Sequence, residues 1–394
     1  MNIIIGQQNC GPTYIPRVSL EEASQLFTKL YDHKVDKIKT LVGYVTQNFY
    51  IKTSSSGDTK TAKEYVFKIC PFQYQNMKGL TDVSIKTMLY LNDCGIVCPA
   101  PLKTIKGKYV TTEEVNCCRA SPSSTSKKEE ECITQSACLV YTLTYLPGNT
   151  LEAACPKSVP LPWFKDLGQY LARIDKALMD YPHVEDIPMM TKQGQNSEWS
   201  LNTIPRYRAL LYVVQDDTMR NLIESVIDEF EKEVVPKIPQ LRTAMIYNDF
   251  NQNNIIAKVS TTKDSKDVDQ HTLDIIGIID FNDICCSCIL FEIGIASTYM
   301  MYIQKEGDRL AACRQFLQGY ESVISLTEDE WQLLPLCIAA RCVQGVLAGL
   351  YSFELDPTNE YVRRDIHNGY EILKYIRSIP SQKIVKYWRG QASD

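Results

Sequence analysis

The sequence has few histidines, a single C-x-x-C pair and no long apolar run. Four histidines occur among 394 residues, and no two have H-x₃₋₅-H spacing. Cys285 and Cys288 have C-x-x-C spacing, but a structural zinc site needs four ligands and there is no second C-x-x-C pair. No run reaches the roughly 18 apolar residues of a membrane span. The sequence therefore argues against a zinc module and predicts no membrane partner.

An excess of positive charge is missing as well. The formal net charge is −5, whereas a broad nucleic-acid footprint needs a basic face, so nucleic acid is not an expected partner. The start, MNIIIGQQNC, lacks the basic segment and apolar core of a signal peptide. The 15 cysteines are odd in number and follow no regular framework. We expect a reduced, cytoplasmic protein with small buried thiols.

What is present is a change of pattern along the chain. The first part has a capping box, Ser19 with Glu22, and then mostly strand patterns. These strand patterns lie at 39–53, 63–70 and 137–151, around one helical pattern at 81–95. Beyond Pro147-Gly148 the patterns are mostly helical, at 163–181, 219–238, 330–353 and 359–376.

This order predicts a two-lobed α+β fold. We expect a β-rich N-terminal lobe over 1–146 and a mostly helical C-terminal lobe over 147–394, joined at a Pro-Gly hinge. Clefts between domains are common ligand sites, so we expect the site there. Two polar segments, 119–134 and 259–272, are expected to be solvated loops. The oligomeric state is left open.

Two short segments in the second part carry the chemistry. In AMIYNDFNQNNIIAKV, Asp249 follows an apolar run and Asn254 comes five residues later. In LDIIGIIDFND, an apolar strand pattern delivers Asp280 at its end. Phosphoryl transfer needs a carboxylate for the attacking hydroxyl and oxygen ligands that hold Mg²⁺ against phosphates. Asp249 could alone be a turn or cap residue, but the combination favours phosphoryl transfer.

A nucleotide kinase also needs a lysine for the phosphates. Lys68, in EYVFKIC, is the candidate, and the alternative is an ordinary solvent-facing strand lysine. The preceding segment VGYVTQNFYIK contains Gly43 but no G-x-G-x-x-G pattern. Backbone amides with Gln47 or Asn48 would then have to cover the phosphates.

These segments together resemble the aminoglycoside phosphotransferase and choline kinase group, which has a protein-kinase-like fold. The signature of that group is H-G-D-x-x-x-x-N followed by I-D-F/W. Within the group the chain is especially similar to the hydroxylysine kinases. The segments that carry this similarity include YTLTYLPGNTL, LGQYLARIDKAL, GIIDFNDICCSCILFEIGIASTYMM and LPLCIAARCVQGVLAGL.

The resemblance implies a role for each candidate residue. Asp249 is implied as the catalytic base, and Asn254 and Asp280 as Mg²⁺ ligands. Lys68 is implied to bind phosphates, and the segment containing Tyr145 and Leu146 to receive the nucleobase. GTP or ATP is the implied donor, and 5-hydroxylysine or a similar hydroxylated amino acid is the implied acceptor.

The chain departs from the family pattern at three places. Tyr247 and Asn248 replace the His and Gly before the catalytic Asp, and we expect Tyr247 to serve as an aromatic support. Asn282 stands where Gly is usual, and Asn tolerates the positive φ of such a turn. The helix at 81–95 lacks the Glu that usually pairs with the lysine, which leaves Asp82 as a substitute.

The acceptor end is less determined by the sequence. Asp283 faces the acceptor or caps the next helix. Arg341 binds a substrate carboxylate or pairs with an acid such as Glu292, which otherwise braces the catalytic loop. Trp199 packs on the substrate or fills core. Two alternatives stay open: another alcohol (homoserine, choline or methylthioribose) as acceptor, or an inactive nucleotide-binding protein of the same fold.

Overall fold

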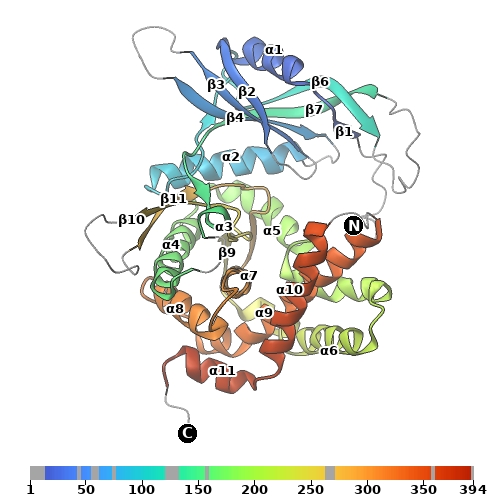
Figure 1. The fold of residues 1–394 in the computed structure, drawn as a ribbon, viewed down its shortest axis with the longest axis vertical. Helices are drawn as coiled ribbons and strands as arrows, with labels where there is room; N and C mark the ends of the chain where they lie inside the picture. The colour runs from blue at the N-terminus through green and yellow to red at the C-terminus, as the bar shows by residue number, and fades with distance from the viewer. Residues whose placement is uncertain are drawn as a thin grey trace. The chain divides into compact units, whose positions relative to one another are not determined.

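The computed structural model describes residues 14–41, 46–54, 62–72, 77–119, 133–155, 159–261, 271–355 and 360–391. Contacts divide the chain into two compact units at Gly148. We call Gln8–Pro147 the N-terminal unit, and we call the unit that contains Gly148–Asp394 the C-terminal unit. Figure 1 shows that the first is built on a β-sheet and that the second is mostly helical.

The N-terminal unit is an antiparallel sheet with two helices. The strand order is β1-β6-β7-β4-β3-β2, and β5 also pairs with β7. The strands are β1 (Tyr14–Pro16), β2 (Val35–Leu41), β3 (Gln47–Thr53), β4 (Lys63–Pro71), β5 (Pro101–Leu102), β6 (Val110–Arg119) and β7 (Ile133–Thr144). The helices are α1 (Leu20–Tyr31) and α2 (Met77–Asp93), which lie on opposite faces of the sheet (Figure 1).

Several sequence predictions fall within this unit. The capping box is confirmed, because Ser19 Oγ accepts from Glu22 N at 3.2 Å and Ser19 N donates to Glu22 Oε2 at 2.8 Å. The run 39–53 is two strands rather than one, since β2 ends at Leu41 and β3 begins at Gln47. Gly43 and the centres of the two polar segments at 119–134 and 259–272 lie outside the described residues.

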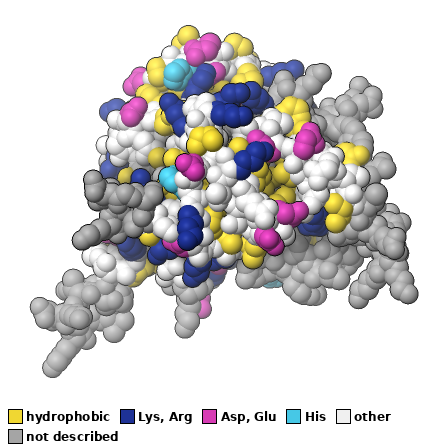
Figure 2. Space-filling view, turned by 90° about the horizontal axis from the view of Figure 1, so that it is seen from above, with side chains coloured by type: hydrophobic (Ala, Val, Ile, Leu, Met, Phe, Trp, Pro, Cys, Tyr) yellow, Lys and Arg dark blue, Asp and Glu magenta, His cyan; other side chains and the backbone are white. Residues whose placement is uncertain are grey.

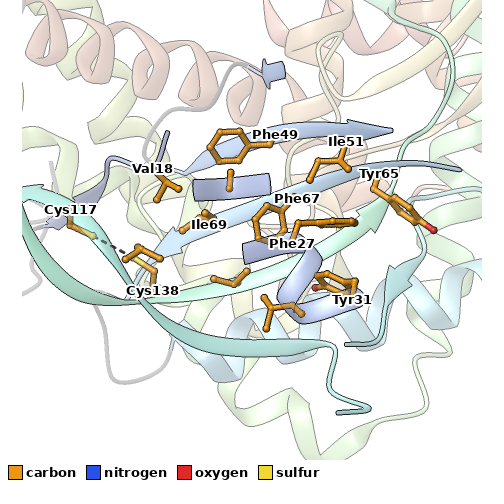
Figure 3. Packing of buried hydrophobic residues seen from close by; sticks show 14 residues of the cluster. Val18, Phe27, Tyr31, Phe49, Ile51, Tyr65, Phe67, Ile69, Cys117 and Cys138 are labelled. Atoms are coloured by element: carbon orange, nitrogen blue, oxygen red, sulfur yellow. Dashed lines mark hydrogen bonds between the residues drawn. The ribbon is translucent and has the colours of Figure 1, made fainter. Parts of the chain in front are cut away.

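One face of the sheet forms an aromatic core with α1. Phe27 stands edge-on to Phe67 of β4, with ring centroids 5.5 Å apart (Figure 3). Ile69 of β4 and Phe49 of β3 belong to the same buried cluster. Successive strand residues point to opposite faces. Lys68, between Phe67 and Ile69, therefore lies on the face away from this core.

The C-terminal unit holds two small antiparallel sheets among helices. Its sheets are β11-β10-β8 and β12-β9. The strands are β8 (Asn149–Thr150), β9 (Thr243–Ile246), β10 (Ile255–Thr261), β11 (His271–Ile278) and β12 (Cys285–Cys288). The α-helices are α3 (Leu151–Ala154), α4 (Leu161–Met179), α5 (Ile187–Asn196), α6 (Asp217–Glu233), α7 (Ile289–Ile303), α8 (Arg309–Glu321), α9 (Glu328–Leu355), α10 (Glu360–Arg377) and α11 (Ser381–Trp388). Three 3₁₀ segments are η1 (Val184–Asp186), η2 (Leu201–Val213) and η3 (Val235–Gln240). With the N-terminal sheet, this confirms the predicted α+β class.

Helix α9 is the most apolar long helix that the structure describes. Its segment Glu328–Glu354 meets the length and composition of a membrane span, but 83% of its apolar window is buried inside the protein. A buried core helix meets the same test, so the helix is weak evidence for a membrane.

The face seen in Figure 2 has basic, acidic and apolar side chains interspersed among the described residues.

Candidate active site

Two loops of the C-terminal unit are held next to each other by two strand ladders. The first loop joins β9 to β10 and carries Asp249 and Asn254; the second joins β11 to β12 and carries Asp280 and Asp283. The β10–β11 ladder pairs Ile255 with Ile278, at one end of each loop. The β9–β12 ladder pairs Ile246 with Cys285, at the other ends. This register brings the two loops together.

The first loop folds around the carboxylate of Asp249. Asn254 Nδ2 donates to Asp249 Oδ2 at 2.6 Å, and Asn251 Nδ2 donates to Asp249 Oδ1 at 2.8 Å. Both amides also donate to the Asp249 carbonyl, at 3.1 and 3.2 Å. Because each carboxylate oxygen accepts from a fixed amide, the rotation of this side chain is restricted. The amide oxygen of Asn254 is left to face a cation.

Ile279 is bonded to the first loop through both of its backbone groups. Its N–H donates to the Asn254 carbonyl at 2.9 Å, and its carbonyl accepts from the Tyr247 hydroxyl. Tyr247 is fully buried and stands edge-on to Phe281, with centroids 5.3 Å apart. Asp280 lies between Ile279 and Phe281, which both contact the first loop. These contacts therefore fix its position relative to Asp249. Tyr247 thereby has the packing of an aromatic support.

The left-handed residues of the site are Asn248, with φ 65°, and Asp280, with φ 61°. The expected positive φ at Asn282 is therefore wrong; the turn places it two residues earlier, at Asp280. Glu292 of α7 accepts from the Asn248 backbone N–H and stabilises that conformation. This contact supports the expectation that Glu292 braces the loop.

The side chain of Asn248 has no evident role in this arrangement. It is 1% exposed, and neither its Nδ2 nor its Oδ1 has a hydrogen-bond partner among the described residues. A buried polar group without a partner costs about 1–3 kcal/mol. A left-handed backbone also favours glycine.

Asn248→Gly is therefore expected to raise the free energy of unfolding by about 1 kcal/mol with turnover retained. Urea denaturation measures the change. Asn253→Gly is the matched control in the same loop, because Asn253 is exposed and lacks a positive φ. That control should lose stability through the added freedom of the unfolded chain. A stability loss in Asn248→Gly as large as in the control would contradict the argument.

Burial and nearby charges bring the pKa of Asp249 close to neutral pH. Burial raises the pKa of Asp249 to about 6; Asp280 adds to the rise, and Arg341 most strongly opposes it. Burial, followed by Asp249 and Asp280, raises the pKa of Asp283 well above its usual value. A carboxylate with a pKa near the working pH can accept a proton from a hydroxyl.

The donor set fits Mg²⁺ better than a transition metal. Asp280 is exposed, and Asn254 offers an amide oxygen from the neighbouring loop. Among the residues with described positions, no group of three or more His, Cys, Asp or Glu side chains could enclose a metal. Mg²⁺ is held by one or two protein oxygens together with water and phosphate, so an open pair of oxygen ligands suits it.

The structure contradicts the structural alternatives for two residues, namely an ion pair with Glu292 for Arg341 and a helix cap for Asp283. Arg341 bonds Trp199 O at 3.2 Å and Tyr299 Oη at 2.9 Å, so the suggested pairing with Glu292 is wrong. The next helix, α7, has Cys288 as its N-cap, so Asp283 is not its cap. The acceptor role of both residues stays a prediction.

The nucleotide candidates lie in the N-terminal unit. Lys68 is only 9% exposed, so the solvent-facing alternative is wrong. Its Nζ lies 5.8 Å from the ring centroid of Tyr141, and it forms no ion pair with the described residues, Asp82 included. Tyr145 N donates to Glu64 O at 3.0 Å. The Tyr145 amide is thus used in a bond to β4, and the nucleobase role of Tyr145 and Leu146 stays a prediction.

A second buried carboxyl lies behind the loop. Asp175 of α4 is 1% exposed and accepts from Tyr320 Oη of α8 at 2.7 Å. Burial raises the pKa of Asp175 to about 7 from 3.8. Its charge also raises the pKa of Glu292, for which burial is the larger cause.

This shift predicts a pH-dependent stability. Between pH 4 and 7 the folded protein holds a proton on Asp175 that the unfolded chain has lost, so stability falls as the pH rises. Asp175→Asn mimics the protonated form. It should gain about 2 kcal/mol over wild type between pH 5 and 8. Thermal melts across this range test it, with Asp166→Asn, exposed on the same helix, as control. Parallel curves for Asp175→Asn and wild type would contradict it.

Several residues of the site had not been singled out from the sequence. Asn251, Tyr299 and Gln344 bond Asp249 or Arg341, and Glu198 lies beside Trp199. The asparagine-rich run after Asp249 was a signal for Asn251. The other three come from segments far apart in the chain, and no local pattern marks them.

The amino-acid sequence is similar to those of known phosphotransferases. Residues 38–326 match the phosphotransferase enzyme family. Hydroxylysine kinase of Xenopus laevis is 30% identical over 377 residues, which span 95% of this chain and 93% of that protein. Hydroxylysine kinase of Bos taurus is 28% identical over 385 residues, with 97% and 95% covered.

Solved structures share the fold at lower identity. An amicoumacin kinase in complex with AMP-PNP and Ca²⁺ has a TM-score of 0.58 at 14% identity, covering 91% of this chain and 93% of that one. A choline kinase from Cryptosporidium parvum has a TM-score of 0.52 at 14% identity, covering 93% and 98%. The chain therefore belongs to the phosphotransferase enzyme family, and it is a small-molecule kinase whose relatives along nearly its whole length are hydroxylysine kinases.

Proposed function

We propose that this protein transfers the γ-phosphate of GTP or ATP to the hydroxyl of 5-hydroxylysine or a similar hydroxylated amino acid, in the cytoplasm. The observation that carries the proposal is the tethering of the two loops. Asp249 is oriented by two amides, and Asp280 is held beside it through both backbone groups of Ile279. The similarity to hydroxylysine kinases supports hydroxylysine as the acceptor.

Asp249 has the central role in the transfer. Its carboxylate orients the acceptor hydroxyl and takes its proton as the hydroxyl oxygen bonds to the γ-phosphorus. The bond from that phosphorus to the bridging oxygen breaks, and the nucleoside diphosphate leaves. Asn251 and Asn254 hold the carboxylate in place, so little reorganisation is needed when the oxygen attacks.

Asn254 and Asp280 are the residues that would hold Mg²⁺, and that ion neutralises charge on the phosphates when bound. Lys68 is assigned to the phosphates and the Tyr145–Leu146 segment to the nucleobase. Asp283 and Arg341 are assigned to the charged groups of the acceptor. A buried lysine without a carboxylate partner, as Lys68 is among the described residues, suits phosphate binding.

An acceptor panel tests the proposal. Purified protein is incubated with Mg²⁺, either GTP or ATP, and hydroxylysine, homoserine, choline, ethanolamine or methylthioribose, and nucleoside diphosphate release is measured. Hydroxylysine is expected to give the highest kcat/KM. A higher value for another alcohol would overturn the acceptor, and tight nucleotide binding without turnover on any of them would overturn the proposed reaction.

A further inference from the structure

Arg341 is a buried cation that forms no ion pair with the described carboxylates. It is 4% exposed, and its guanidinium lies between the rings of Trp199 and Tyr299, 5.1 and 5.4 Å from their centroids. Nη1 donates to Trp199 O and Gln344 Oε1, and Nη2 donates to Tyr299 Oη. An arginine has five N–H groups. The Nε–H and one Nη2–H are left over, and no carboxylate pairs with Arg341 among the described residues.

Glu198 is the converse, a carboxylate that forms no ion pair with the described cations. Its Oε2 is buried and has no hydrogen-bond partner among the residues with described positions. The backbone at Glu198 is nevertheless tightly held, because its carbonyl accepts from Tyr207 Oη at 2.7 Å and from Gln344 Nε2 at 2.8 Å. The side chain thus starts from a fixed point and still lacks a donor.

These two opposite charges are neighbours that do not pair. Arg341 bonds the carbonyl of Trp199, the residue after Glu198, yet no ion pair joins the two side chains. Gln344, fully buried, bonds both residues, since its Oε1 accepts from Arg341 and its Nε2 donates to the backbone carbonyl of Glu198. A buried charge without a partner is destabilising. A packing that keeps both charges unpaired is explained if each receives a group from a ligand.

Both charges act on the reaction centre. Tyr299, which accepts from Arg341, lies two turns after Glu292 on α7, and Glu292 accepts from the N–H of Asn248, the residue before Asp249. Burial raises the pKa of Asp283, and among the nearby charges Arg341 lowers this pKa while Glu198 raises it. A small acceptor with its hydroxyl at Asp249 would therefore have its remaining groups near this pair.

We propose that Arg341 and Glu198 form a receptor for a zwitterion, in which Arg341 binds the carboxylate of the acceptor and Glu198 its α-ammonium. The inference rests on the proposed kinase function and adds the residues that would distinguish an α-amino acid from a simple amino alcohol. The free Nε–H and Nη2–H of Arg341 offer a carboxylate two charge-assisted hydrogen bonds. Trp199, Tyr299 and Gln344 are positioning residues that keep the guanidinium from Glu198.

Substrate analogues test this on the wild-type protein, so no variant has to fold. Hydroxylysine, its decarboxylated analogue and its analogue without the α-ammonium are compared for kcat/KM. Each analogue should lose about 10- to 100-fold, the range for a hydrogen bond to a charged group. Equal kcat/KM for hydroxylysine and the two analogues would overturn the proposal while leaving the kinase function intact. No phosphorylation of any of the three would instead count against the proposed function itself.

Variants then assign each charge to its residue. For Glu198→Gln, kcat/KM should fall about 10- to 100-fold with hydroxylysine but under about threefold with the analogue that lacks the α-ammonium. Tyr299→Phe keeps the ring and removes one bond to Arg341; it should raise KM for hydroxylysine and not for the decarboxylated analogue. KM for the nucleotide should stay unchanged in both. Glu306→Gln, exposed in the same unit, is the control. Equal losses with all three acceptors, or a raised nucleotide KM, would show a structural or phosphate-binding role and overturn the assignment.

Discussion

Asp249→Asn is expected to reduce kcat by roughly a thousandfold, within the range for loss of a general base. The amide of asparagine cannot take the proton of the acceptor hydroxyl. The substitution is nearly isosteric, so nucleotide affinity should be retained. Steady-state turnover at saturating hydroxylysine, with nucleotide binding by calorimetry, gives both quantities.

The same substitution has a smaller predicted effect on stability. Asn251 and Asn254 each donate to one oxygen of the Asp249 carboxylate, and an asparagine there offers only one acceptor. One donor loses its partner, which should lower the free energy of unfolding by about 1–2 kcal/mol. Asp274→Asn, an exposed carboxylate of β11, is the matched control and should change neither property. Turnover of Asp249→Asn within tenfold of wild type would rule out Asp249 as the base.

Gly319→Ala is expected to destabilise the C-terminal unit by about 3 kcal/mol or more, because backbone would have to move. A Cβ on Gly319 of α8 would lie 2.0 Å from the carbonyl oxygen of Lys165 on α4. The contact is reciprocal, since a Cβ on Gly168 of α4 would lie 1.9 Å from the carbonyl oxygen of Phe316 on α8. The two helices touch through their backbones at these glycines.

Gly345→Ala is the control for this prediction, since Gly345 lies exposed in α9 and a Cβ there would have nothing within 4 Å. It should gain up to about 1 kcal/mol, because alanine favours the helix more than glycine does. Chemical denaturation of the two variants therefore gives opposite signs. A Gly319→Ala variant as stable as wild type would show that α4 and α8 can separate without loss.

The crossing of α4 and α8 also reaches the catalytic loop. Tyr320 follows Gly319 and bonds Asp175, and the charge of Asp175 acts on Glu292, which holds the Asn248 amide. Separating the helices would disturb this series of contacts. Some loss of turnover is therefore expected in Gly319→Ala even where the protein remains folded.

The sequence by itself determined the local structure and the reaction class of this protein. Amphipathic periodicity located α4, α6 and α9, and the Ser19–Glu22 capping box marked the start of α1, because these signals depend on neighbours along the chain. The spacing of Asp249, Asn254 and Asp280 indicated phosphoryl transfer for the same reason, since two short loops carry all three residues. Helix ends were displaced by a few residues, as in α2, which starts at Met77 instead of 81.

Only the tertiary structure decided what depends on distant segments. No pattern in a local window marks the burial of Lys68, the positive φ of Asp280, the backbone contact at Gly319 or the bonds of Gln344 to both Arg341 and Glu198. Each arises where elements far apart in sequence are packed together, and the packing sets which charges are paired. The sequence therefore identified the phosphoryl-transfer residues, whereas the groups proposed to read the acceptor became apparent only once α7, α9 and the segment before η2 were brought into contact.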